Sequence, residues 1–232
     1  MKKSFFLIAL IAIFGLIGCQ TKPTKTIENL KAAIKGETTA SAKYKAFAEK
    51  ARTEGLDTIA ILFDAASQAE GIHAANHSKV LEGLGEKMEE FKPEFDVKTT
   101  AENLQAAIDG ETYESTTMYP EFIKTATEEK VDKAVKSFNW ANDTEKKHNA
   151  YYVKALETLK TGSEKNLPFV FYVCPVCGNT YDQATLEKNC AFCVSTPGIG
   201  GVCTMGIPLT AASVLDMPPG LVKSTSQASI YS

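Results

Sequence analysis

Two pairs of acidic and imidazole side chains have a spacing that suits metal binding. Glu70-x-x-His73 and Glu145-x-x-His148 each place a carboxylate and an imidazole three residues apart. In a helix, residues at this spacing project from the same face and can reach one ion. The chain has only three histidines, and two of them follow a glutamate in this way. These pairs therefore predict a metal site built from helices.

Four cysteines near the C-terminus form a second candidate metal site. They occur as Cys174-x-x-Cys177 and Cys190-x-x-Cys193, with 12 residues between the pairs. Each pair offers two thiolates, and four thiolates complete a tetrahedral site. Both iron and zinc accept such a site, and two disulfides are a further alternative in an oxidising compartment. The strand-forming residues around the first pair, which predict a short hairpin, are Tyr172, Val173 and Tyr181.

The acidic pairs lie within an internal repeat. Residues 29–38 recur as residues 103–112, at an offset of 74, whereas the Glu-x-x-His pairs recur at an offset of 75. One residue is therefore inserted in the second copy, between Thr112 and Tyr119. An extra residue inside a helix is most simply absorbed as a π-bulge, which is frequent at functional sites. Two copies of a two-helix unit predict four helices.

The apolar periodicity agrees with four helices. Apolar residues recur every three or four positions over residues 27–51, 59–84, 104–122 and 131–159, as in amphipathic helices. Thr99 and Glu102 have the spacing of a capping box that opens the third helix. Residues 85–98 form a long connection between the two pairs. Short links within pairs and one long crossover predict a mainly α four-helix bundle.

Each of these helices carries a glutamate on its core-facing stripe. The four residues are Glu37, Glu70, Glu111 and Glu145. A buried carboxylate is costly unless it is paired or bound to a metal. Nothing basic lies on these stripes, and the only arginine, Arg52, lies off them. A metal is the natural counter-charge, and the alternative is a solvated helix face in a loose bundle.

These motifs together resemble the rubrerythrin family. The resemblance is carried by residues 110–114 and 118–122, by the acidic pairs, and by the cysteine module that follows the bundle. It covers about residues 26–193 and implies a ferritin-like four-helix bundle followed by a small rubredoxin-like four-cysteine β-ribbon domain.

The resemblance also implies roles for individual residues. The implied ligands of two irons are Glu37, Glu70, His73, Glu111, Glu114, Glu145 and His148. His73 and Glu114 would alternate as ligands of one iron when the redox state changes, with the inserted turn rotating Glu114 into the site. Tyr44 and Tyr119 would hydrogen-bond to the ligands.

The implied ligands of a third iron are Cys174, Cys177, Cys190 and Cys193, and zinc is the alternative metal. His77 also lies on a core-facing stripe, but its counterpart in the second copy is Tyr152. We therefore expect His77 to be a core or near-site histidine rather than a ligand.

The function implied by the resemblance is that of a non-haem peroxidase. Hydrogen peroxide would be reduced to water, and the ribbon iron would return electrons singly to the bundle of a partner subunit in a head-to-tail homodimer. The electron donor is not identified. The alternatives are a ferroxidase or iron-binding envelope lipoprotein with a structural zinc ribbon, and an envelope structural or interaction protein with a degenerate bundle. The cysteine module favours the peroxidase, because iron storage needs no electron relay.

The N-terminus predicts export. Lys2 and Lys3 precede an apolar run of 15 residues, 4–18, which is shorter than the ~20 residues that span a bilayer. The run ends in Leu16-Ile-Gly-Cys19, which resembles the lipobox of bacterial lipoproteins. We expect Cys19 to be lipidated and the protein to be an extracytoplasmic, lipid-anchored protein of the bacterial cell envelope. Ordinary signal cleavage is the alternative.

Composition limits the remaining possibilities. The 232 residues include 44% hydrophobic residues, which excludes wholesale disorder, and the net charge of −3 argues against a nucleic-acid partner. The expected segments are a signal peptide (1–18), a lipidated tether (19–25), the bundle (26–162), the ribbon domain (168–196) and a tail of unknown structure (197–232), which contains Cys203.

Overall fold

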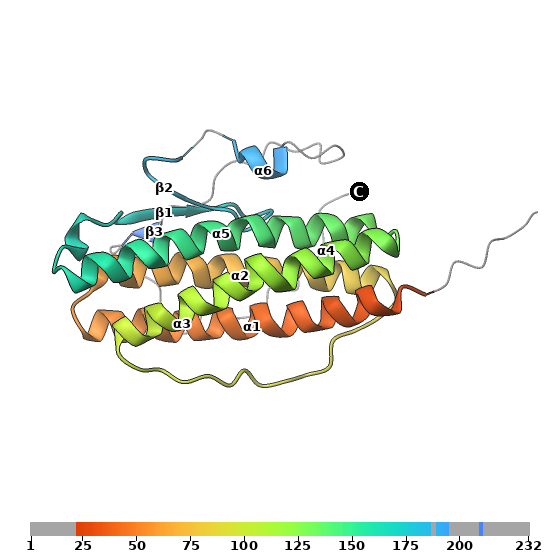
Figure 1. Cartoon of the computed structure of the whole chain (residues 1–232), viewed down its shortest axis with the longest axis horizontal. Helices are drawn as coiled ribbons and strands as arrows, with labels where there is room; N and C mark the ends of the chain where they lie inside the picture. The colour runs from red at the N-terminus through yellow and green to blue at the C-terminus, as the bar shows by residue number, and fades with distance from the viewer. Residues whose placement is uncertain (1–21, 187–188, 195–208, 211–232) are drawn as a thin grey trace, which may run out of the picture.

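A computed structural model describes residues 22–186, 189–194 and 209–210. Most of these residues are helical, and the long helices lie side by side in one bundle (Figure 1). The bundle helices are α1 (Thr24–Thr53), α2 (Asp57–Gly83), α3 (Thr100–Tyr113), α4 (Tyr119–Glu128) and α5 (Asp132–Lys160). The predicted mainly α bundle is confirmed.

The helix boundaries have local causes. Gly55 adopts a positive φ of 77° after α1, a conformation that glycine adopts without a steric cost. The segment between α2 and α3 runs along the outside of the bundle (Figure 1). At its end, the Thr99 side chain accepts a hydrogen bond from the Glu102 backbone N–H, and the Glu102 carboxylate accepts one from the Thr99 N–H. The predicted capping box is confirmed.

A π-helix, η1 (Glu114–Met118), joins α3 to α4. It lies within the segment where the repeat predicts one inserted residue. The wide π-turn absorbs that residue, so the helix keeps the same face inward before and after it. Glu111 and Tyr119, on either side of the turn, are both fully buried. The predicted π-bulge is confirmed.

Two apolar clusters fill the bundle. One includes Tyr44, Phe63 and Tyr152, and the other includes Leu30 and Phe138. Along each long helix, the two clusters take residues from opposite sides of the core-facing glutamate. The glutamates therefore lie in a polar layer that is closed at both ends by apolar side chains.

The four-cysteine segment folds as a small sheet. Strand β1 (Val170–Val173) pairs antiparallel with β2 (Thr180–Asp182), and Tyr172 lies opposite Tyr181, as the predicted hairpin requires. A third strand, β3 (Leu209–Thr210), pairs with the other edge of β1. This strand lies beyond residue 196, where the ribbon domain is predicted to end, so part of the tail completes the sheet. A short helix, α6 (Ala191–Val194), carries Cys193.

The ribbon lies against α2 and α5 of its own chain (Figure 1). Asn76 of α2 donates a hydrogen bond of 2.8 Å from Nδ2 to the Val176 carbonyl. Lys147 of α5 donates from Nζ to Asn179 Oδ1 at 2.7 Å, and its ammonium group lies 4.3 Å from the centre of the Tyr181 ring. Polar contacts from two helices therefore hold the ribbon on the bundle.

The predicted signal peptide, Cys19 and Cys203 lie outside the described residues. Among the helices that the structure describes, none combines the length and the apolar character needed to cross a bilayer.

Candidate metal centres

The bundle brings its predicted carboxylates and imidazoles together at its centre. Each long helix supplies one glutamate, and α2 and α5 each add a histidine one turn later. The six side chains, none of them more than 1% exposed, are Glu37, Glu70, His73, Glu111, Glu145 and His148.

These side chains form two overlapping groups of four. Glu37 and His73 belong to one group, Glu111 and His148 belong to the other, and Glu70 and Glu145 belong to both. His73 Nδ1 lies 3.0 Å from both Glu70 Oε2 and Glu145 Oε1. His148 Nδ1 lies 3.2 Å from Glu70 Oε1 and 3.1 Å from Glu145 Oε2. Each shared carboxylate therefore turns one oxygen toward each histidine, which is the arrangement of a ligand that bridges two ions.

Burial and mutual proximity shift the proton affinities of the site. Burial disfavours the charged form of His73, but the Glu145 and Glu70 carboxylates outweigh it and raise its pKa to about 10. Burial also disfavours the charged form of His148, but the Glu70 and Glu145 carboxylates outweigh this effect and raise its pKa to about 9. Burial, reinforced by the charges of Glu70 and Glu145, raises the pKa of both Glu37 and Glu111 well above the usual value. Protons thus compensate part of the negative charge in the metal-free chain.

Several buried polar atoms at the centre lie close to one another, but none of them is aligned for a hydrogen bond with a described residue. They are Glu37 Oε2, Glu70 Oε1, Glu111 Oε2, both carboxylate oxygens of Glu145, and His148 Nδ1. Orphaned buried oxygens are costly. Two divalent cations would satisfy the ligand atoms, and their charge would balance four carboxylates. The oxygen and imidazole donors suit iron, so the residues present fit a di-iron site.

Glu114 is not a member of either group of four. It begins the π-helix, its side chain is half-buried, and Oε1 would lie 3.8 Å from a Cβ added at Gly36. Burial, together with the charges of Glu145 and Glu70, raises the pKa of Glu114 to about 8. Of the two residues expected to alternate, His73 is therefore in the site, and Glu114 lies beside it.

The two predicted phenols contact one carboxylate each. Tyr44 donates a hydrogen bond of 2.7 Å from its hydroxyl to Glu111 Oε1. Tyr119 donates in the same way to Glu37 Oε1. These contacts are those that the sequence resemblance implies.

His77 is fully buried but belongs to neither group of four. Its Nδ1 lies 2.7 Å from Ser137 Oγ, and its Nε2 lies 3.1 Å from Tyr119 Oη. Burial, with a smaller effect from His73, lowers the pKa of His77 to about 3, so its ring is neutral. This is a satisfied near-site histidine, as expected.

The four cysteines of the ribbon form a compact buried cluster. Their sulfur atoms all lie within 4.8 Å of one another. Cys174 Sγ lies 3.6 Å from Cys193 Sγ, and Cys177 Sγ lies 3.5 Å from Cys190 Sγ. A disulfide would require about 2.05 Å, whereas sulfurs around one tetrahedral metal at 2.3 Å lie about 3.8 Å apart. The cluster fits a single four-thiolate metal ion.

The ribbon touches the di-iron ligands directly. His148 Nε2 lies 2.9 Å from Thr180 Oγ1, so this hydrogen bond leaves Nδ1 facing the site. Gly178 lies against the His73 ring, where an added Cβ would lie 2.7 Å from Cδ2. Gly178 also has a φ of 81°, so both conformation and space require glycine there.

Thr180 and Ser137 are not identified by sequence reasoning. Thr180 is 32 positions from His148, and Ser137 is 60 positions from His77. Neither residue belongs to a motif. Gly178, by contrast, has a sequence signal, because it directly follows a cysteine pair.

Comparisons with known proteins agree with this geometry. A family model described as Rubrerythrin matches residues 28–156. The nigerythrin of Nitratidesulfovibrio vulgaris is 37% identical over 182 residues, covering 75% of this chain and 84% of the relative. Rubrerythrin-2 of Clostridium acetobutylicum is 34% identical over 173 residues, covering 74% and 91% of the two chains.

Solved structures give the same result. The fully reduced, all-ferrous state of nigerythrin superposes with a TM-score of 0.64 at 36% identity, over 71% of this chain and 80% of that one. Its mixed-valent state gives a TM-score of 0.65 at 38% identity, over 72% and 81%. An open-pore ferritin of Archaeoglobus fulgidus, at 18% identity and a TM-score of 0.52, shares the fold. With its di-iron and four-cysteine sites, this chain belongs to the rubrerythrin family.

Proposed function

We propose that this chain is a non-haem di-iron peroxidase that reduces hydrogen peroxide to water. One peroxide, two electrons and two protons yield two water molecules. The main support is the direct contact between the two metal-binding sites, through Thr180 with His148 and Gly178 with His73. Iron storage needs no such electron relay, so the contact favours a redox enzyme over a ferroxidase that only deposits iron.

The bound irons would supply the two electrons and hold both peroxide oxygens. The chain's own residues prepare the site for this chemistry. Glu70 and Glu145 turn an oxygen toward each half of the site. Tyr44 and Tyr119 restrain the other carboxylates by hydrogen bonds. The apolar clusters at both ends exclude water, which strengthens electrostatic interactions within the site.

We infer that the four-cysteine site holds iron and returns electrons one at a time. Two successive transfers would restore the reduced bundle site after each peroxide. Tyr181 donates a hydrogen bond of 3.3 Å from its hydroxyl to Cys190 Sγ, and hydrogen bonds to the sulfurs tune the reduction potential of such a centre. An external reductant supplies the electrons of this centre.

Metal analysis combined with peroxidase assays tests the proposal. Anaerobically purified protein should contain about three irons per chain and oxidise on addition of peroxide. Glu70→Ala should lose the bundle irons, keep the ribbon iron, and lower turnover about 100-fold or more. Glu82→Ala, which removes an exposed carboxylate of α2, is the matched control.

Two outcomes would contradict the peroxidase. One is full activity of the Glu70→Ala protein. The other is oxidation of the reduced protein by O₂ much faster than by peroxide, which would favour the ferroxidase. Zinc in the four-cysteine site of the native protein would instead remove the internal relay.

We also propose that the protein is a lipid-anchored envelope protein, with Cys19 as the acylated residue. The support is the charged start, the apolar run and the lipobox-like end of residues 1–19. Mass spectrometry of the mature protein should find acyl chains on Cys19, and an unmodified cysteine would contradict this. A head-to-tail homodimer remains part of the proposal on family resemblance.

A further inference from the structure

A chain of hydrogen bonds leads from Glu37 to the edge of the bundle. Tyr119 donates its hydroxyl to Glu37 Oε1. His77 Nε2 lies 3.1 Å from the same hydroxyl oxygen, and Ser137 Oγ lies 2.7 Å from His77 Nδ1. The series crosses from α1 to α4, α2 and α5 without a gap.

The ligand carboxylate fixes the direction of every bond. When Glu37 binds a metal ion it is ionised and can only accept, so the Tyr119 hydroxyl must donate to it. The Tyr119 oxygen then accepts from His77 Nε2–H. A neutral imidazole has one N–H, so Nδ1 is an acceptor and takes the Ser137 hydroxyl proton. All donors therefore point inward, toward the metal ligand.

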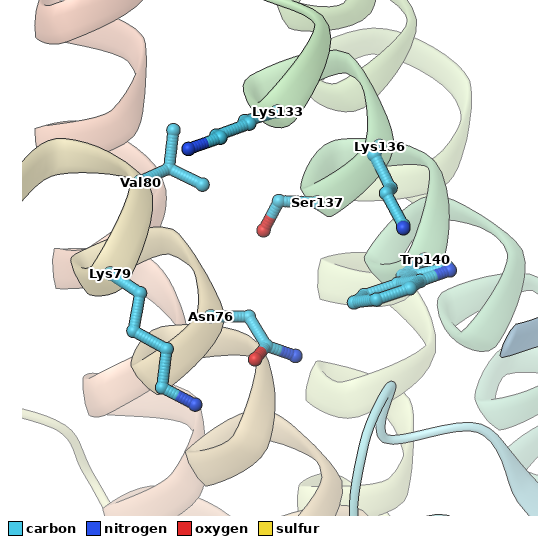
Figure 2. Close-up of a pocket in the computed structure, with 7 residues that line it drawn as sticks. All are labelled: Asn76, Lys79, Val80, Lys133, Lys136, Ser137 and Trp140. Carbon is cyan, nitrogen blue, oxygen red and sulfur yellow. The ribbon is translucent and has the colours of Figure 1, made fainter. Parts of the chain in front are cut away.

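The outer end of this chain opens into a hollow between α2 and α5. The hollow has a volume of about 280 Å³ and is lined by Asn76, Lys79, Val80, Lys133, Lys136, Ser137 and Trp140. Figure 2 shows the Ser137 hydroxyl pointing into the space between the two helices. Among the described residues, none of the three lysines has an ion-pair partner, so their ammonium groups can orient water in the hollow.

The other half of the site has no equivalent path. Tyr44 contacts Glu111 as Tyr119 contacts Glu37, but the repeat places Tyr152 where the first copy has His77. The Tyr152 hydroxyl is buried and has no hydrogen-bond partner among the described residues. The His77 branch is therefore a specific feature of one side and does not follow from the repeat.

We propose that Ser137, His77 and Tyr119 carry protons from the lysine-lined hollow to Glu37. This role rests on the proposed peroxidase function, in which each peroxide takes up two protons. Water in the hollow gives a proton to Ser137 as Ser137 passes its own to His77 Nδ1. His77 passes its Nε2 proton to Tyr119, and Tyr119 passes its hydroxyl proton to the Glu37 carboxylate. Bulk solvent neutralises the hydroxide left in the hollow. Rotation of the two hydroxyls and of the imidazole then returns the hydrogen bonds to their starting directions.

A matched pair of variants isolates the Ser137 hydroxyl. Ser137→Thr and Ser137→Val have the same shape, but only threonine keeps the hydroxyl. Stopped-flow mixing of the reduced holoprotein with peroxide should show oxidation about tenfold or more slower in Ser137→Val than in Ser137→Thr. His77→Gln, which keeps hydrogen-bonding atoms but cannot relay a proton in the same way, should be similarly slow. Ser78→Ala, which removes a hydroxyl that donates to the Ala74 carbonyl of α2, is the control and should react like the unmodified protein.

A second measurement does not depend on peroxide chemistry. In ¹⁵N-histidine-labelled full-length protein loaded with Zn²⁺, NMR should find His77 protonated at Nε2. Exchange of this ring proton with D₂O should be about tenfold slower in Ser137→Val than in Ser137→Thr, because the ring is otherwise fully buried.

The outcomes separate the two proposals. If peroxide does not oxidise the reduced protein, the peroxidase proposal fails, while the exchange measurement still tests the path. Equal oxidation and exchange rates in Ser137→Val and Ser137→Thr, with metal content unchanged, would overturn the proton path and leave the peroxidase proposal intact.

Discussion

At the scale of single residues, His73 and His148 have different partners beyond the site. His148 Nε2 is held by Thr180. His73 Nε2 has no hydrogen-bond partner among the described residues and lies against Gly178. One histidine is therefore anchored to the ribbon, while the other is held by packing. This difference gives a structural reason why His73 would be the ligand that yields its place to Glu114.

Iron loading should release protons from both histidines. Their pKa values in the metal-free chain are raised to about 10 and about 9, so both are protonated at neutral pH, and binding through Nδ1 must displace that proton. We expect iron affinity to rise with pH across the neutral range and to level off only above pH ~10, where both histidines have lost the proton. Anaerobic calorimetry in buffers of different ionisation enthalpy, on protein whose four-cysteine site is already filled, measures the release. An apparent enthalpy that is independent of the buffer would contradict the prediction.

At the scale of elements, the π-helix η1 keeps the same face of α3 and α4 turned toward the metal site. Residues in an α-helix advance by about 100° each, so one inserted residue would otherwise turn all later side chains away from the core. η1 absorbs it, and Glu111 and Tyr119 remain buried on the same side.

Deleting Thr117 should therefore straighten the helix without breaking the site. Thr117 is exposed within η1, and its loss would give Glu111 and Tyr119 the seven-residue spacing that Glu37 and Tyr44 have in α1. Tyr119 and Ala126 would stay on the buried face, so we expect the Glu37 contact and the iron content to be kept and the stability to change by less than about 1 kcal/mol. Iron analysis and chemical denaturation measure both effects. Thr117→Ala keeps the chain length and should behave like the unmodified protein. Loss of iron, or a stability lower by about 3 kcal/mol or more in the deletion variant, would contradict the role of η1.

At the scale of the whole molecule, the ribbon covers the di-iron site of its own chain. Three bundle side chains hydrogen-bond to the ribbon: Asn76 to Val176, Lys147 to Asn179, and His148 to Thr180. The family resemblance implies that the ribbon serves a partner's bundle, whereas these contacts need no partner. A dimer and an internal relay are compatible.

Mixing two inactive variants tests the internal relay. Glu70→Ala should lack the bundle irons, and Cys177→Ser should lack the ribbon iron. If each ribbon serves its own bundle, a mixture refolded or co-expressed together should recover little donor-dependent peroxidase activity. Recovery of about a quarter or more of the unmodified rate would show that ribbons act between subunits, as in the head-to-tail arrangement. Size-exclusion chromatography of the mixture confirms whether mixed dimers form.

The chemistry of the site can be read from the sequence because helical periodicity is local. Spacings of three and four residues put Glu70 with His73, and Glu145 with His148, on one face each. The change of offset from 74 to 75 locates the π-helix, and the paired cysteines locate the second metal site. The family, the bundle and the donor atoms follow from these patterns.

The contacts between elements do not follow from such patterns, because packing in three dimensions joins residues without any characteristic spacing. Examples are the hydrogen bonds of Thr180 with His148 and of Ser137 with His77, and the pairing of the strand Leu209–Thr210 with β1. Packing also sets which atoms of Glu70 and Glu145 face each histidine, and leaves Glu114 beside the site. Periodicity names the ligands of this protein, while the packing of the ribbon and four helices decides how protons and electrons can reach them.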